Sequence, residues 1–251
     1  MALFDVNIDA TCGNARALTF ETAHGTVHTP MFMPVGTHAT VKGVTTPQLR
    51  ELNSQVVLAN TYHLYMRPGV DIIEKAGGVQ KFMNYDGPML TDSGGFQLFS
   101  LDHMMKTDPD GVTFHARDYD GSKHRWTPES NMDIQQRIGA DIVMQLDQCI
   151  GYPSPKEAVA ASTKLSWEWA ERCCAAHTRE DQALFAIVQG GMHRDLRLES
   201  VKRLIEIDAA SRAAGHKGFQ GYGIGGYSGG GPHGVMFETL GDVCQALPDN
   251  R

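Results

Sequence analysis

Short apolar runs that end abruptly in polar or glycine residues recur six times along the chain. They span Phe32–Gly36, Val56–Asn60, Pro88–Asp92, Ile142–Asp147, Leu184–Gln189 and Tyr222–Gly226. Apolar and polar residues do not alternate strictly within these runs, which is typical of parallel strands buried on both faces. The pattern therefore predicts six parallel strands.

Helix-like segments separate several of these runs. Ser154–His177 carries Ala, Leu and Trp at helical spacing after a Ser-Pro start, and Arg194–Ala214 is a second such segment. Strands that alternate with helices predict an α/β fold with a parallel sheet. A TIM-type (β/α)8 barrel needs eight strands, so about six of eight would be present and the barrel incomplete. Residues 1–251 are expected to form a single domain of this type, unless the fold is not an eight-fold barrel.

Two stretches depart from this pattern. Gly111–Trp126 alternates as antiparallel strands do, with a turn at Tyr119–Ser122, and predicts an inserted antiparallel hairpin. Phe4–Thr29 has the same character around Ala23–Gly25 and predicts an N-terminal β-hairpin that forms a lid over one end of the barrel.

Composition narrows the possible functions. The formal charge of −7 argues against a surface that grips phosphates by itself. No apolar stretch approaches the roughly 20 residues that a bilayer requires, and the N-terminus lacks the basic start and apolar run of a signal peptide. The 5 cysteines are scattered without the ligand spacing of a zinc site. These features predict free thiols, no metal ligands, and a cytoplasmic protein without membrane association.

Polar residues stand where four of the predicted strands end. They are Asp92, Asp147, Gln189 and the Gly225-Gly226 pair. In barrels of this type the carboxyl ends of the strands carry the reactive groups, so these residues would converge on one mouth. Each also has an ordinary explanation, because an Asp after a strand often caps the next helix and a Gln before Gly-Gly can simply turn the chain. Four such ends on four strands favour a shared site.

The most specific signal is the heptapeptide Thr91-Asp92-Ser93-Gly94-Gly95-Phe96-Gln97. Its glycines allow close approach of the backbone to a ligand, and their amides can donate hydrogen bonds. This heptapeptide occurs together with Phe32-Met33-Pro34-Val35-Gly36-Thr37, Asn60-Thr61-Tyr62-His63-Leu64, Arg67-Pro68-Gly69 and Val188-Gln189-Gly190-Gly191. From about Gly25 to its end, the chain resembles the tRNA-guanine transglycosylase family, and its bacterial branch in particular.

The resemblance implies a role for each of the polar strand ends. Asp92 matches the family's general acid/base, which exchanges a proton with the departing and the incoming base. Asp147 matches the carboxylate that accepts hydrogen bonds from the N–H edge of the base, and Gln189 matches a further contact to that edge. A carboxylate that accepts twice and an amide that both donates and accepts suit a guanine-like edge.

The resemblance also implies which residues surround the base. Gly226 matches a position whose backbone touches the substituent of the base, and Tyr227 replaces the family's usual aliphatic residue, which would reshape that space. Cys149 favours prequeuosine-1 over queuine as the incoming base, although it can equally be a small packed core residue. The same pocket would be lined by Ser93, Gly94, Gly95 and Phe96.

The implied reaction is the pentosyl transfer of queuosine biosynthesis. Guanine at the wobble position of the tRNA anticodon is replaced by a 7-deazaguanine in a double displacement at ribose C1′, by the logic of retaining glycosidases. The target nucleotide must leave the stack to reach the pocket. Beyond Arg251 we expect the family's nucleophilic Asp, its main tRNA-binding strips and its zinc cluster. The full-length protein is expected to form a homodimer.

Three rival functions use the same residues. The chain can be a non-catalytic accessory or binding subunit of the same family, but a purely structural partner has no need of a base pocket. An unrelated glycosidase could use Asp92 and Asp147, yet this leaves the Thr91–Gln97 heptapeptide unexplained. Base exchange in DNA would keep the chemistry and change the nucleic acid.

Overall fold

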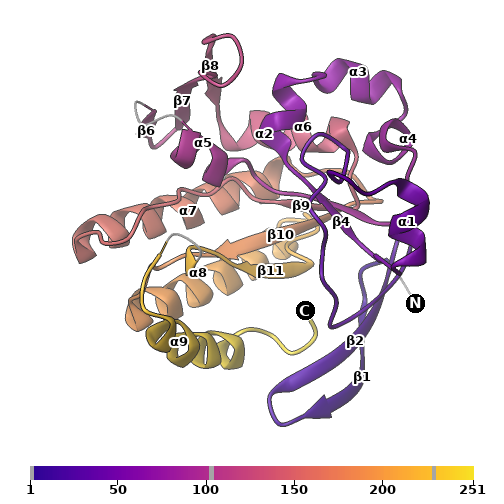
Figure 1. Cartoon of the computed structure of the whole chain (residues 1–251). Helices are drawn as coiled ribbons and strands as arrows, with labels where there is room; N and C mark the ends of the chain where they lie inside the picture. Colours follow the sequence, from indigo (N-terminus) through magenta and orange to yellow (C-terminus); the bar gives the residue numbers. More distant parts are fainter. Residues whose placement is uncertain (1–2, 102–104, 228–229) are drawn as a thin grey trace.

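The centre of the molecule is a parallel five-stranded sheet (Figure 1). The computed structural model describes residues 3–101, 105–227 and 230–251. The strands lie in the order β11-β10-β9-β5-β4, so sheet neighbours follow one another along the chain, as in a barrel wall. This confirms the predicted α/β class. The strands are β4 (Val57–Ala59), β5 (Met89–Thr91), β9 (Ile142–Met144), β10 (Ala183–Val188) and β11 (Gly221–Ile224).

The predicted sixth strand at Phe32–Gly36 is wrong beyond a single parallel bridge between Val35 and Leu58. Gly36 N donates to Leu58 O at 2.6 Å and Leu58 N donates to Pro34 O at 3.0 Å. Pro34 has no amide N–H, so this segment cannot extend the ladder. Within the described residues, the sheet does not close into a barrel.

Helices follow the sheet strands and pack on one another in chain order, α6 on α7, α7 on α8 and α8 on α9. The predicted helices are confirmed to within two residues at each end as α7 (Lys156–Ala176) and α8 (Arg194–Ala213). None of the helices within the described ranges is both long and apolar enough to cross a membrane. Besides α7 and α8, the helices of the described residues are α1 (Thr46–Glu51), α2 (Thr61–Met66), α3 (Val70–Lys75), α4 (Val79–Met83), α5 (Gly95–Leu101), α6 (Pro128–Ile138) and α9 (His233–Ala246).

The two faces of the sheet have different neighbours. Residues that point to the helices are fully buried and form the main core, among them Val57, Met89, Val143 and Leu184. The residues between them in sequence point to the opposite face, where Leu58, Met144, Phe185 and Ile187 line a cavity and remain partly exposed. Apolar runs without strict alternation therefore reflect a core on one face and a cavity on the other.

The inserted hairpin is confirmed as β7 (Gly111–His115) paired antiparallel with β8 (Lys123–Trp126). A third strand that the pattern did not predict, β6 (Lys106–Asp108), pairs with β7. Trp126 is buried between this hairpin and α2, with Tyr62 at 6.5 Å between ring centroids.

The N-terminal residues form a three-stranded antiparallel sheet of β1 (Val6–Cys12), β2 (Ala15–Thr22) and β3 (Gly25–His28). The turn between β2 and β3 lies at the amino end of the parallel sheet, because His24 N and Nδ1 contact Asp141 Oδ1 at 3.2 and 2.8 Å, directly before β9. Phe4 and Val27 share a second core cluster with Leu90 and Ile142. The predicted lid thus covers the end of the sheet opposite the functional side chains.

Candidate active site

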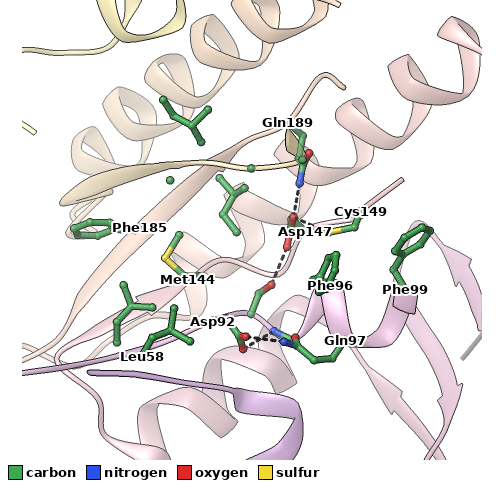
Figure 2. Close-up of a pocket in the computed structure, with 18 of the residues that line it drawn as sticks. Leu58, Asp92, Phe96, Gln97, Phe99, Met144, Asp147, Cys149, Phe185 and Gln189 are labelled. Atoms are coloured by element: carbon green, nitrogen blue, oxygen red, sulfur yellow. Dashed lines mark hydrogen bonds between the residues drawn. The ribbon is translucent and has the colours of Figure 1, made fainter. Parts of the chain in front are cut away.

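A cavity of about 510 Å³ lies at the carboxyl end of the parallel sheet (Figure 2). Asp92, which directly follows β5, and Gln189, which directly follows β10, both line it. Asp147 lines it from the segment after β9. The structure therefore brings together the three polar side chains that the sequence predicted to converge.

Asp147 is buried at the centre of this group and accepts hydrogen bonds on both carboxylate oxygens. Ser93 Oγ donates to Oδ1 at 2.8 Å and Gln189 Nε2 donates to Oδ2 at 2.6 Å. The Cys149 thiol lies 3.6 Å from Oδ2. Asp147 thus connects the loop after β5 with the end of β10.

Asp92 is held by four donors. Asn60 Nδ2 donates to Oδ2 at 2.5 Å and Thr61 N donates to Oδ1 at 3.0 Å, so the end of β4 fixes one side of the carboxylate. Gly94 N and Gln97 Nε2 donate from its own loop at 3.1 and 3.0 Å. These bonds orient Asp92 toward the cavity from the floor formed by β4 and β5 (Figure 2).

Burial dominates the titration of both carboxyl groups. Burial raises the pKa of Asp92, and the hydrogen bonds led by that of Asn60 oppose the shift. Burial raises the pKa of Asp147 too, against the bonds from Ser93 and Gln189. Burial, followed by the negative charge of Asp147, raises the pKa of the Cys149 thiol, so this residue lines the cavity as a neutral thiol. A carboxyl group with a raised pKa is suited to exchanging protons with a ligand.

Two glycines permit the close packing around these side chains. A Cβ on Gly95 would lie 2.6 Å from Asp147 O and 2.7 Å from Asp147 Oδ1. A Cβ on Gly226 would lie 2.6 Å from Gln189 Oε1, and the φ of Gly226 is +81°, a conformation that L side chains rarely adopt. Both positions therefore require glycine for the site to keep its shape.

Most of the predicted pocket residues line the cavity, but two do not. Ser93, Gly94, Phe96 and Gly226 contribute to the lining. Gly95 lies behind Asp147 instead, as its contacts show. Tyr227 does not line the cavity either, because its ring stacks on the guanidinium of Arg197 and its hydroxyl lies 2.6 Å from Thr239 Oγ1. The expected effect of the Tyr227 phenol on the space around the base is thus not seen at this position.

The sequence did not assign a role to several residues that build the site. Asn60 and Thr61 hold Asp92, and Asn60 could have been found as a polar residue at a strand end. Gln97 belongs to the heptapeptide, and its Oε1 is buried without a hydrogen-bond partner in the described residues. Phe99 and Ile150 also line the cavity, with no polar pattern to mark them.

The remaining lining is apolar. Leu58, Leu90, Met144 and Ile187 surround the polar group from the strands, and Met33 contributes from the segment beside β4. Phe96 and Phe99 line the cavity from α5. An apolar cavity with a few convergent polar groups is the usual form of a small-molecule site. Carboxylates that accept and amides that donate and accept suit a flat heterocycle with N–H and C=O groups on its edge.

The described residues offer no metal site. In ranges 3–101, 105–227 and 230–251, no group of three or more His, Cys, Asp or Glu is placed to hold an ion. Cys12 and Cys244 are exposed, whereas Cys173 and Cys174 are buried. The described residues therefore provide no set of ligands for the zinc that the family resemblance implies.

Comparison with known proteins points to one family. The family model described as queuine tRNA-ribosyltransferase matches residues 10–251. The chain is 49% identical to the queuine tRNA-ribosyltransferase of Desulforamulus reducens over 94% of its length and 61% of that protein. It is 49% identical to that of Thermoanaerobacter sp. over 95% of its length and 61% of the relative. For the enzyme of Ruminiclostridium cellulolyticum the identity is 46%, over 100% of this chain and 65% of the relative.

The chain thus spans about three fifths of the length of the curated relatives it matches. The match nevertheless includes β4, β5, β9, β10 and β11, and with them every side chain that surrounds the cavity. This chain belongs to the queuine tRNA-ribosyltransferase family.

Proposed function

We propose that these 251 residues provide the base-binding part of an enzyme that exchanges guanine in tRNA for a 7-deazaguanine. The observation that carries the proposal is the convergence of Asp92, Asp147 and Gln189, from three strands, on one cavity. Family membership supports the reaction class, since the relatives are named queuine tRNA-ribosyltransferases.

In this function Asp147 and Gln189 recognise the base. The Asp147 carboxylate accepts hydrogen bonds from the N–H groups of a guanine edge, in place of the Ser93 and Gln189 donors it binds now. The Gln189 amide then donates to or accepts from the same heterocycle. Phe96 and the apolar strand residues contact its faces. The incoming base is prequeuosine-1, with Cys149 beside Asp147 at the edge of the site.

Asp92 acts as general acid/base. Its carboxyl group protonates the departing guanine and later accepts the proton of the incoming base, a task that suits its raised pKa. A carboxylate displaces guanine from ribose C1′ and is itself displaced by the new base, so two inversions give retention. This nucleophile is a further Asp, which the family resemblance implies beyond Arg251. Dimerisation and a cytoplasmic location stay predictions.

Binding of the base is the direct test. Isothermal calorimetry of the chain with guanine and with 7-aminomethyl-7-deazaguanine is expected to show one site. Asp147→Asn is expected to weaken binding about 10- to 100-fold, since hydrogen bonds to charged groups contribute about 1.5–3 kcal/mol. Asp133→Asn, at an exposed carboxylate 3.9 Å from Arg137, is the matched control and should leave the affinity unchanged.

A wild-type chain that binds neither base contradicts the proposal. Assay of the same chain for exchange of guanine in tRNA should give little turnover, because loss of a covalent nucleophile costs several orders of magnitude in rate. Robust turnover would show that the nucleophile lies among these residues. Competition between tRNA and duplex DNA distinguishes the two nucleic acids.

A further inference from the structure

Arg197 is a fully buried cation directly behind the wall of the cavity. Its side chain is 0% exposed, and it lies in the first turn of α8, next to the end of β10. No carboxylate of the described residues forms an ion pair with it, whereas the other arginine of that turn, Arg194, is exposed and pairs with Asp242. Burial of a charge without a counterion is costly, so its surroundings need an explanation.

The guanidinium is satisfied by backbone carbonyls of two strand ends. Nε donates to Gly191 O at 2.7 Å and a terminal nitrogen donates to Val188 O at 3.3 Å, both at the end of β10. The other terminal nitrogen donates to Gly225 O at 2.9 Å, at the end of β11. The planar, multidentate form of the guanidinium allows one side chain to connect both segments.

The same guanidinium also packs against the residues that follow the two strands. Its Cζ lies 3.6 Å from the centroid of the Tyr227 ring, which is a cation–π distance. A Cβ on Gly190 would lie 2.6 Å from Arg197 Cγ, and one on Gly226 would lie 3.5 Å from a terminal nitrogen. Glycines thus bring both loops into contact with Arg197.

We propose that Arg197 is a positioning residue that clamps the end of β10 to the end of β11 and so holds Gln189 and Gly226 as one wall of the base site. Tyr227 completes the clamp, with its ring on the guanidinium and its hydroxyl on Thr239 of α9. In this role Tyr227 supports the wall from behind. The inference rests on the proposed base-binding function.

The clamp is tested first without any ligand. Arg197→Lys keeps a positive charge and most of the stem but loses the planar fork. Hydrogen exchange of the backbone amides is expected to become at least tenfold faster for residues 189–191 and 225–227, including the Gly225 amide that donates to Val188 O. Arg194→Lys is the matched control on the same helix and should leave exchange in these segments unchanged. Equal protection in folded Arg197→Lys and control proteins overturns the clamp.

The consequence for the site is tested by base affinity. Arg197→Lys is expected to weaken guanine binding about tenfold in calorimetry while the protein stays folded, with its Tm close to that of the Arg194→Lys control. Arg197→Met, which removes the charge, should weaken it further. Unchanged affinity in Arg197→Lys shows that Arg197 does not position the wall. A wild-type chain that binds no base contradicts the proposed function instead, and the hydrogen-exchange comparison still decides the clamp.

Discussion

At the scale of single residues, the site is built from polar groups that are satisfied by one another. Asp92 takes its donors from β4 and from its own loop, whereas Asp147 takes its donors from the β5 loop and β10. Asp92 is thereby oriented before a ligand arrives, which reduces the reorganisation that binding would require, whereas Asp147 exchanges its present donors for those of the base. This arrangement buries two acids, and their burial raises the pKa of each.

This burial makes stability depend on pH in a defined direction. The pKa of Asp92 is raised above its ordinary value of 3.8, so the folded protein binds more protons than the unfolded chain as pH rises from about 4. The contribution of Asp92 to stability is therefore greatest below pH 4 and is lost as pH rises through the raised pKa. Asp92→Asn cannot ionise, so the free energy of unfolding of the wild type should fall relative to this variant between pH 4 and neutrality in urea titrations.

A difference between wild type and Asp92→Asn that stays constant over this range would contradict burial as the dominant cause. Asp86→Asn is the control, because Asp86 is exposed and pairs with Arg50. Its pKa is lowered by the hydrogen bond from Arg50, so its contribution to stability is lost only as pH falls below about 4. The difference between wild type and Asp86→Asn should therefore change little between about pH 4 and neutrality.

At the scale of elements, close packing of the loop after β5 against the segment after β9 decides the shape of the site. Gly95 begins α5 with its Cα against the backbone of Asp147. The contacted atoms belong to backbone and to a buried carboxylate, so neither element can yield without moving the site.

Gly95→Ala is therefore expected to destabilise the protein by about 1–3 kcal/mol, as overpacking of a filled region does, and to abolish base binding. Gly241→Ala is a matched control in α9, where nothing lies within 4 Å of the added Cβ. That change should stabilise the protein by about 0.5–1 kcal/mol through helix propensity. Chemical denaturation measures both. Wild-type affinity in Gly95→Ala would show that the loop adapts freely.

Most helices and strands could be predicted from the sequence, because the spacing of apolar residues and the length of the apolar runs reflect which residues are buried. The strands after residue 56 and the helices α7 and α8 follow this rule. Phe32–Gly36 has the same composition but only one strand neighbour and a proline, which hydropathy does not reveal. Asp92, Asp147 and Gln189 were found because they follow strands. Arg197 could not be found, since a buried and an exposed arginine on one helix look alike in sequence.

At the scale of the whole molecule, the two ends of the sheet have separate tasks. The carboxyl end carries the cavity, and the amino end is covered by the N-terminal sheet. Asp141 holds that cover, since it accepts bonds from His24 N, His24 Nδ1, Gln80 Nε2 and Met89 N. The Asp141 carboxylate is buried, so its removal would take a hydrogen-bond partner away from each of these donors.

Asp141→Ala is expected to lower the free energy of unfolding by about 2–3 kcal/mol, because it leaves buried donors unpaired. Base affinity should stay within about twofold of wild type, since the change lies at the opposite end of the sheet. Asp86→Ala, at an exposed ion pair, should cost much less than Asp141→Ala. Denaturation and calorimetry of the same samples separate the two effects. Loss of base binding in folded Asp141→Ala would show that the ends are coupled.

The most direct test of the account is a crystal structure of this chain with guanine bound. We predict density for the base in the cavity, with its N–H edge on the Asp147 carboxylate, the Gln189 amide on the same ring, and Asp92 within hydrogen-bond distance. Density at any other place, or a base in the cavity that contacts only one of these three side chains, would contradict the shared site.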